Sequence, residues 1–559
     1  MKTFKSVADL KLAKLRTGQF VETNGYYAEA DGGGAKYYIV ASQAADEYGD
    51  HTLANGNVAV LQDAKTNLNY GCAADSVVND TLALQALDAA GGGVIKKGIV
   101  RVKANITLVS NYEFKNGGII APDSIYTVAW SGAITAGDYK IFDGNFKVSK
   151  VNKVSEVKVV WFGALSSDLD SDMGDQTLAD SNAKAIRQAA SMVNIGIPAG
   201  IYVTPILRLL NGLCIVDDDD NDGVILDIGS YMTVLGYGDA SVIRPKNNAK
   251  AFDVMSMTVN GASSMVLNDF QIYGEASAQV NAQNGIVANP PAGSQIYNKL
   301  GNGIYVKEMS GNAAKIIGQG WENSKWSPRL MRDSTLHNLL VTRCNEVEFT
   351  GCTYRTAKFG NSGAVFDGPG VIAAHIHHNN FDENNVNGLV MSNTGGRHRV
   401  HDNGMKSNFT GQGASFDRVD HSQIHGNKFE ANGTRGATID NCTNVDWANN
   451  KSRSNQEHGQ VFACNNSNIL GNSSYRDGQG ADNTYSGILI TGAAADDNNA
   501  QGNKVRHGGG AVQLKYGFEI APAGAGANFV TNNDLKNSGR TTDFFNDGGG
   551  TVTTPGNRT

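Results

Sequence analysis

The sequence predicts an all-β chain folded as a parallel β-helix, because two short patterns recur through its second half with a shared period. The first is a glycine followed by a strand-like stretch, beginning at Gly363, Gly388, Gly413, Gly436, Gly459, Gly487 and Gly517. The second is an asparagine shortly after an apolar residue, at Asn380, Asn403, Asn427, Asn450, Asn472, Asn503 and Asn533. Both series repeat every 22 to 31 residues. One supersecondary unit is therefore repeated along an axis.

Each repeat is expected to form one coil of short strands. In the repeat that begins at Gly413, Ala414 and Phe416 should point inward and Ser415 outward, since side chains alternate along a strand. Glycine and asparagine at the corners would supply the positive φ angles of sharp bends. Asparagine-rich turns, such as those at Asn379 and Asn450, are expected to stack into amide ladders.

An amphipathic helix is predicted before the repeats, over residues 181–194, with Ala185, Ile186, Ala189 and Met192 on one face. A strand should follow at 196–203, and the helix would close the open end of the β-helix. Residues 69–102 repeat the same order of loop, helix and strand. We expect a small N-terminal module over 1–65, a connecting pseudo-repeat over 66–156, the main β-helix over 157–540 and a short tail over 541–559.

Composition excludes several classes of protein. The 559 residues carry a net charge of −7, so a nucleic-acid partner is not expected. No stretch reaches 18 apolar residues and the first 15 residues lack an apolar core, so we expect synthesis in the cytoplasm without an export signal or membrane insertion. The six cysteines have no CxxC spacing, which favours buried free thiols over disulfides or a zinc site.

Three segments resemble bacteriophage tailspikes with polysaccharide depolymerase activity. Residues 10–40, with a GYY pair and a DGGG turn before an aromatic strand, resemble the virion-attachment module of many tailspikes. The WFGA, AIRQAA and IPAGIYV segments between 161 and 203 resemble the cap of their pectate-lyase-like β-helices, and VLNDFQIYG at 266–274 is similar to an early coil. This resemblance implies that the parallel β-helix is right-handed. The GHG and RIK signatures of polygalacturonases are absent.

The resemblance implies a homotrimer in the virion tail. It would attach to a tail or baseplate protein through the N-terminal module, and bind and cleave a bacterial capsule or O-antigen polysaccharide. Hydrolysis is the first expectation for the activity. The alternatives are a polysaccharide lyase acting on uronic acids and a noncatalytic polysaccharide-binding tail fibre. No cofactor is expected.

A column of charged residues is predicted three positions after each repeated asparagine. It contains Glu383, Lys406, Glu430, Arg453 and Tyr475. Glu383 and Glu430 would lie two coils apart, roughly 9–10 Å, close to the carboxylate separation of inverting glycosidases. A ladder of ion pairs that holds the coils together is the structural alternative.

A second carboxylate column follows the repeated glycines at Asp367, Asp417 and Asp440. Asp417 and Asp440 would lie on adjacent coils, about 5 Å apart, which suits the retaining geometry. Aspartates at strand ends also cap turns by accepting backbone hydrogen bonds. In a trimer, a catalytic pair can also be shared between subunits.

Histidines form a third column at His378, His401 and His425. A metal site is not expected from them, because ligands stacked along one axis do not converge on one ion. With Arg397 or Arg399, a histidine here could support β-elimination, the arginine neutralising a uronate carboxylate while the histidine removes a proton. A solvated polar ladder is the alternative.

Two further features are candidates for ligand contacts. Trp321 and Trp326 fall in an insertion over 318–331, where they would stack on sugar rings, pack the loop or form a trimer contact. The acidic run at 217–222 lacks the spacing of a calcium loop and is interpreted as a solvated turn. Trp447, by contrast, is predicted to be a core residue.

Overall fold

The structure is a computed structural model, and it divides the chain into two compact units. The first contains Met1–Asp168, Asp175–Cys214 and Met232–Leu235, and the second contains the remainder, including Gly236–Thr559. The described residues are 1–149, 152–167, 175–194, 205–229, 231–246, 250–257, 263–274, 282–290, 296–300, 303–317, 324–358, 361–492, 495–508, 511–521, 526–547, 552–553 and 556–559.

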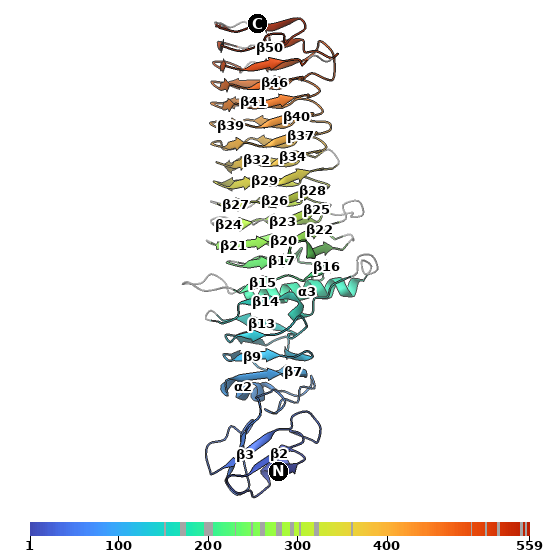
Figure 1. Cartoon of the computed structure of the whole chain (residues 1–559), viewed down its shortest axis with the longest axis vertical. Coiled ribbons are helices and arrows are strands. Elements are labelled where there is room, and N and C mark those ends of the chain that lie inside the picture. Colours follow the sequence, from blue (N-terminus) through green and yellow to red (C-terminus); the bar gives the residue numbers. More distant parts are fainter. Residues whose placement is uncertain are drawn as a thin grey trace. The chain divides into compact units, whose positions relative to one another are not determined.

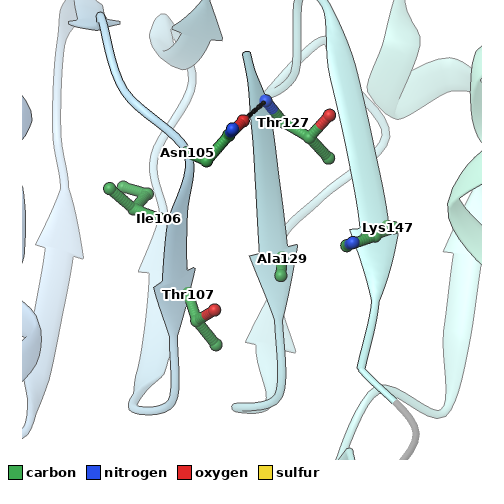
Figure 2. Close-up of a pocket in the computed structure, with 6 residues that line it drawn as sticks. All are labelled: Asn105, Ile106, Thr107, Thr127, Ala129 and Lys147. Carbon is green, nitrogen blue, oxygen red and sulfur yellow. Dashed lines mark hydrogen bonds between the residues drawn. The ribbon is translucent and has the colours of Figure 1, made fainter.

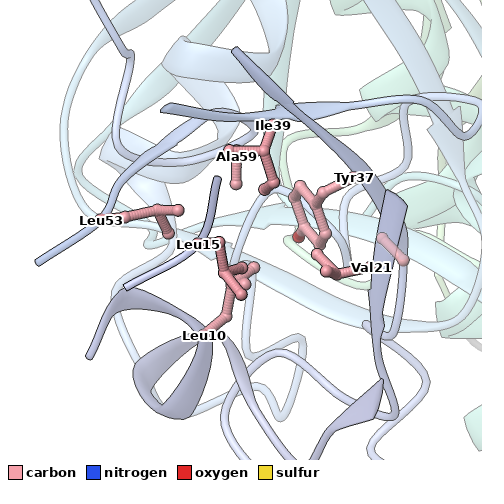
Figure 3. Packing of buried hydrophobic residues seen from close by; sticks show 8 residues of the cluster. Leu10, Leu15, Val21, Tyr37, Ile39, Leu53 and Ala59 are labelled. Atoms are coloured by element: carbon pink, nitrogen blue, oxygen red, sulfur yellow. The ribbon is translucent and has the colours of Figure 1, made fainter. Parts of the chain in front are cut away.

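The first unit begins with a small mixed sheet. Its strands, in spatial order, are β1 (Lys2–Phe4), β2 (Phe20–Thr23), β3 (Lys36–Val40), β5 (Val58–Leu61) and β4 (His51–Thr52), with α1 (Val7–Lys11) beside them. The buried side chains shown in Figure 3 form its core. The DGGG turn before β3 is held by Asp31, whose carboxylate accepts hydrogen bonds from the backbone N–H groups of Tyr26, Tyr27 and Gly33. The expected aromatic strand after this turn is present as β3.

The rest of the first unit contains short parallel sheets and two longer helices. The predicted helices are confirmed as α2 (Thr81–Ala89) and α3 (Gln176–Val193), and all four predicted apolar-face residues of α3 are buried. The expected strand at 196–203 lies outside the described residues. The other elements are β6 (Gly92–Ile95), β7 (Gly98–Val102), β8 (Ile106–Leu108), β9 (Asn111–Phe114), β10 (Gly118–Pro122), β11 (Thr127–Trp130), β12 (Ile134–Thr135), β13 (Asn145–Val148), β14 (Glu156–Lys158), η1 (Val159–Phe162), β15 (Ile206–Arg208) and β18 (Thr233–Leu235).

The second unit is a parallel β-helix, as predicted. Its strands stack coil upon coil from β17 to β50 in Figure 1 and form three long parallel sheets. Each full coil contributes one strand to each sheet, in the order sheet 1, sheet 2, sheet 3. Two strands, β52 and β53, fall in the segment expected as a tail and pair with the sheets.

Sheet 1 contains β17 (Val224–Asp227), β20 (Asp253–Met257), β23 (Asn284–Ala288), β26 (Ala314–Ile316), β29 (Leu339–Asn345), β32 (Ala364–Ile372), β35 (Leu389–Ser392), β38 (Ala414–Asp417), β41 (Ala437–Thr443), β44 (Gln460–Asn465), β47 (Ser486–Ile490), β50 (Tyr516–Ile520) and β52 (Thr542–Asn546). Within the second unit, sheet 2 contains β21 (Ser263–Asn268), β24 (Ile296–Leu300), β27 (Lys325–Trp326), β30 (Glu348–Thr350), β33 (His375–His377), β36 (Arg399–His401), β39 (Gln423–His425), β42 (Asp446–Ala448), β45 (Asn468–Leu470), β48 (Asn499–Gln501), β51 (Asn528–Thr531) and β53 (Val552–Thr553). Sheet 3 contains β16 (Gly212–Val216), β19 (Ser241–Pro245), β22 (Gln271–Tyr273), β25 (Tyr305–Lys307), β28 (Leu330–Arg332), β31 (Thr353–Arg355), β34 (Asn380–Asp382), β37 (Gly404–Lys406), β40 (Lys428–Glu430), β43 (Lys451–Arg453), β46 (Ser473–Tyr475) and β49 (Lys504–Arg506).

The core of the second unit follows from the alternation along each strand. Ala414 and Phe416 are fully buried, and Ser415 between them is not, as predicted. Trp447 is also a core residue, and its indole N–H donates to Gln460 at 2.7 Å. All six cysteines are buried free thiols, which confirms that prediction. In the described part of the chain, no helix is long and apolar enough to cross a membrane.

Buried asparagines form the predicted amide ladder, with one correction. The side-chain oxygen of Asn403 accepts from the backbone N–H and the side-chain amide of Asn379, at 3.0 and 3.1 Å. The backbone N–H bond to the next side-chain oxygen continues through Asn427, Asn450, Asn472, Asn503, Asn533 and Asn557. Asn379, and not Asn380, therefore occupies the repeat position. The coil between Asn379 and Asn403 is one residue longer than the sequence series assumes.

The turn chemistry agrees with expectation only in part. The repeated glycines do not have positive φ; a Cβ added at Gly413 would lie 2.6 Å from the carbonyl oxygen of Gly436 on the next coil. Close stacking of neighbouring coils therefore requires glycine there. Other corner glycines and asparagines, such as Gly426 and Asn449, do have positive φ as expected, and so do corner residues such as Glu383 and Ala431.

Candidate functional site

Sheet 3 presents a column of ionisable residues on its outer face. Asp382, Lys406 and Glu430 end the consecutive strands β34, β37 and β40 and are in register. A second column on the same face, two positions earlier in each strand, consists of Asn380, Gly404 and Lys428. The residues between the two columns point inward and are fully buried: Phe381, Met405 and Phe429. The column predicted from the sequence is present, with Asp382 in the place expected for Glu383.

Asp382 and Glu430 differ in their surroundings. Asp382 is only 9% exposed, and burial raises the pKa of its carboxyl, although Lys406 Nζ lies 3.8 Å from Oδ2 and opposes the shift. The Glu430 side chain is 49% exposed and its Oε1 lies 3.9 Å from Arg453 Nε. The two carboxylates are separated by two strand spacings, roughly 9–10 Å along the axis. One acid is therefore sheltered from water and the other is open to it.

Glu383 follows Asp382 at the corner of the coil. Its backbone is in the left-handed region and its Oε2 accepts from Arg355 Nε and Nη2 at 2.9 and 2.6 Å. This ion pair joins two coils, as the structural alternative for this column anticipated. The predicted pairing of Glu383 with Glu430 in one column is wrong, because the strand ends one residue earlier than the count assumes.

The aspartate column on sheet 1 has the predicted register. Asp417 and Asp440 are direct neighbours on β38 and β41, and Asp367 lies two strands before Asp417, with Ser392 between them. Asp417 already has partners: Oδ2 accepts from Arg418 at 3.0 Å, and Oδ1 accepts from the Asn441 side chain at 2.9 Å. The structure brings these two carboxylates together on one face.

Sheet 2 carries a group of histidines of which the sequence predicted only some at the right positions. The true column is His377, His401 and His425, because His377 pairs with His401; His378 is at the following corner. His375 lies beside His377 on β33, and its Nε2 is 2.6 Å from His401 Nε2. Alternation along β33 could have identified His375, since residues two positions apart share a face.

Burial and neighbouring imidazoles lower the pKa of the two histidines on β33. Burial, reinforced by His377 and His401, lowers the pKa of His375 to about 4. Burial also lowers the pKa of His377, against the opposing effect of Glu348. Arg399 pairs in register with His375 and is exposed, whereas Arg397 lies in the turn before β36. The predicted residues His401 and Arg399 are thus both on the outer face of this sheet.

The structure tests only one of the two predictions about tryptophans in the insertion. Trp321 lies outside the described residues. Trp326 is 1% exposed in β27, so the prediction that it occupies a loop is wrong; the alternation of side chains along β27 points it into the core.

In the acidic run, Asp217 is fully buried and its Oδ2 lies 3.6 Å from Lys250 Nζ. That part of the run is therefore not a solvated turn.

A pocket of about 350 Å³ lies in the first unit, over β8, β11 and β13. Figure 2 shows its lining, which consists of Asn105, Ile106, Thr107, Thr127, Ala129 and Lys147. The Asn105 side chain accepts from the Thr127 N–H at 2.8 Å. None of the lining residues that the structure describes is a carboxylate, so they supply no acid–base pair. The outer faces of sheets 2 and 3 are the better candidates.

Comparison with known proteins identifies similar solved structures, whereas no family profile and no curated protein matches the chain. The A-module of the mannuronan C-5 epimerase AlgE6 of Azotobacter vinelandii is 16% identical over 72% of this chain and 99% of that one, with a TM-score of 0.44. The enzymatically active domain of tailspike protein 2 of bacteriophage CBA120 is 14% identical over 98% and 61%, with a TM-score of 0.30. The Dettilon tailspike protein is 14% identical over 70% and 68%, with a TM-score of 0.39. A mannuronan epimerase and phage tailspikes are therefore both among the structures to which the chain is similar.

Proposed function

We propose that the protein is a phage tailspike enzyme that binds a bacterial surface polysaccharide, capsule or O-antigen, and hydrolyses its glycosidic bonds. Asp382 acts as the general acid and Glu430 as the general base. The observation that carries this assignment is the register of the two carboxylates on β34 and β40, combined with the burial that raises the pKa of Asp382.

The chemistry follows from the different surroundings of the two acids. A carboxyl with a raised pKa retains its proton at higher pH and can give it to the glycosidic oxygen as the bond breaks. Glu430, open to solvent, takes a proton from the attacking water on the other side of the sugar. A separation of roughly 9–10 Å leaves room for that water and predicts inversion of the anomeric centre. Lys406, between the two acids, is placed to bind an anionic or hydroxyl substituent of the sugar.

A polymer suits this surface because the outer face of sheet 3 is continuous. Strands stacked about 4.8 Å apart form an elongated polar surface over which several sugar units can lie. Cationic side chains stand beside each acid of the column, Lys406 beside Asp382 and Arg453 beside Glu430. This mixed charge favours a polysaccharide that carries some acidic groups.

The test is depolymerisation of a polysaccharide that the protein binds. A panel of capsular and O-antigen polysaccharides is screened for binding, and chain length is then followed by size-exclusion chromatography. Fresh product is examined by proton NMR for its anomeric configuration. We expect shortening, inverted product and no ultraviolet absorbance from unsaturated sugars. Shortening with that absorbance would instead assign β-elimination, and binding without shortening would leave a noncatalytic fibre.

Matched variants separate the candidate acids. We expect Asp382→Asn and Glu430→Gln each to lower kcat by roughly 10²–10⁴-fold with binding retained. Glu383→Gln is the control, because Glu383 lies at the corner after Asp382, outside the column, and its carboxylate pairs with Arg355. If Asp417→Asn or Asp440→Asn abolishes cleavage while Asp382→Asn does not, the site is on sheet 1 and the assignment to sheet 3 is wrong.

For the assembly, we propose a homotrimer in the virion tail, attached to a tail or baseplate protein by the N-terminal module. Three long solenoids can each bury one face along a common axis, which closes the assembly. Light scattering at micromolar concentration should give three times the chain mass of 59.2 kDa. A monomer at that concentration would contradict the proposed assembly without affecting the assignment of the acids.

A further inference from the structure

We propose that His375, His377 and His401 bind one divalent transition-metal ion, Zn²⁺ or a similar ion, on the outer face of sheet 2. Two of the histidines come from β33 and the third from β36, the next strand of the sheet. Each offers one ring nitrogen, and these three atoms lie within 4.8 Å of one another. The convergence arises because His375 approaches from a neighbouring position and not from the same column as the other two.

A hydrogen bond orients His401 for this role. His401 Nδ1 is 2.9 Å from Asp402 Oδ2, so Nε2 is the nitrogen that remains available, and it faces His375 Nε2 at 2.6 Å. A carboxylate on the far nitrogen of a metal-binding imidazole is a frequent arrangement, because it sets the tautomer and the ring orientation. Two nitrogens on one Zn²⁺ with bonds of about 2.0–2.1 Å lie roughly 3.3 Å apart. The two rings therefore need to separate by less than about 1 Å to accept the ion.

Glu348 on β30 is placed near a fourth position. Its Oε1 lies 3.0 Å from His377 Nε2 and 3.2 Å from Lys325 Nζ. Three imidazoles with one carboxylate or one water form a common ligand set for zinc. The Glu348 carboxylate also offsets the positive charge of Lys325 at the margin of the group.

The ligand chemistry selects the class of ion. Imidazole nitrogen favours Zn²⁺, Co²⁺ and Ni²⁺, whereas Ca²⁺ and Mg²⁺ prefer sets of oxygen atoms. The ligands come from consecutive coils, so a bound ion would join neighbouring turns of the β-helix from outside. Binding of this ion is independent of the hydrolytic assignment to sheet 3, because no residue is shared between the two.

The test uses the full chain prepared without a polyhistidine tag and stripped with EDTA. Zn²⁺ is titrated calorimetrically, and Co²⁺ is added separately to record the visible absorption of a low-symmetry cobalt site. We expect one ion per chain and a higher melting temperature in Zn²⁺ than in EDTA. An absence of stoichiometric binding at micromolar Zn²⁺ would overturn the proposal on the unaltered protein.

Variants locate the ion. His375→Asn and His401→Asn should lose the stoichiometric ion, and Asp402→Asn should weaken binding by roughly 10–100-fold. His425→Asn is the matched control, because His425 stacks on His401 at 4.8 Å in the same column but lies outside the trio. Circular dichroism and melting temperatures in EDTA establish that each variant is folded. Unchanged affinity in His375→Asn, or an equal loss in His425→Asn, would refute the assignment.

Discussion

The asparagine ladder allows a sharp test between two adjacent residues, Asn379 and Asn380. Asn379 is 3% exposed; its Oδ1 accepts from the Cys352 N–H at 3.0 Å and its Nδ2 donates to the Phe349 carbonyl at 2.9 Å. Replacing Asn379 with alanine removes the side-chain partner of both buried backbone groups. Each such loss costs about 1–3 kcal/mol, so we expect Asn379→Ala to destabilise its coil by roughly 2–6 kcal/mol.

The matched control is Asn380→Ala. Asn380 is half-buried at the start of β34 and is not in the ladder, so its replacement should change stability by no more than about 0.5 kcal/mol. Because each repeat of a solenoid contacts mainly its neighbours, the loss in Asn379→Ala should be local to the coils around β30 and β34.

Amide hydrogen exchange measures this local opening directly. A cost of 2 kcal/mol or more corresponds to exchange of the Cys352 amide about 30-fold faster or more, since 1.4 kcal/mol is a factor of ten. Thermal unfolding of both variants gives the global effect. Equal effects of the two substitutions, or unchanged exchange at Cys352 in Asn379→Ala, would refute the role assigned to the ladder.

Three further predictions concern buried side chains. Trp326→Ala should cost about 3–5 kcal/mol of unfolding free energy and leave polysaccharide affinity per folded molecule unchanged; a selective loss of affinity would return Trp326 to the binding surface. His398 accepts from the Ala374 N–H through Nδ1 at 3.1 Å, its Nε2 is 2.9 Å from the Thr394 hydroxyl, and burial lowers its pKa to about 4. Its neutral form stabilises the fold above pH 6.5, and this stability is lost as pH falls toward 4, by up to about 3 kcal/mol. Denaturant unfolding of His398→Gln should therefore depend less on pH in that range, and an unchanged pH dependence would contradict the assignment. Burial raises the pKa of the Asp477 carboxyl, although the hydrogen bonds it accepts oppose the shift. The protonated carboxyl therefore contributes to the free energy of unfolding at low pH, and this contribution is lost as pH rises. The melting temperature of Asp477→Asn relative to the parent chain should increase from acid to neutral pH, and a decrease would disprove this reasoning.

Much of the architecture could be predicted from residue spacing. Alternation within the repeats predicted the inward Ala414 and Phe416, and the regular recurrence of asparagine predicted the ladder, because a buried amide column needs one asparagine at the same position of every coil. The helix over 181–194 was predictable from its apolar face. These features depend on local sequence, because apolar residues that recur every 2 residues in a strand or every 3.6 residues in a helix share one face.

The candidate sites depended on register between coils, which the sequence alone could not supply. In the pair Asn379-Asn380 the first residue is in the ladder, whereas in Asn449-Asn450 it is the second, so counting from the second residue placed Glu383 where Asp382 lies. A shift of one residue moves a side chain to the opposite face of a strand.

The sequence by itself determined the all-β solenoid, its period and most of its core. The reason is that alternating apolar residues within each repeat must be buried on one side of a strand, and their positions depend only on the order of the residues. Only the tertiary structure decided which ionisable groups meet. Asp382 aligns with Glu430, and His375 meets His401, because coils of unequal length stack so that inward apolar residues stay in register. The stacking of the core residues thus determines which outward residues become neighbours.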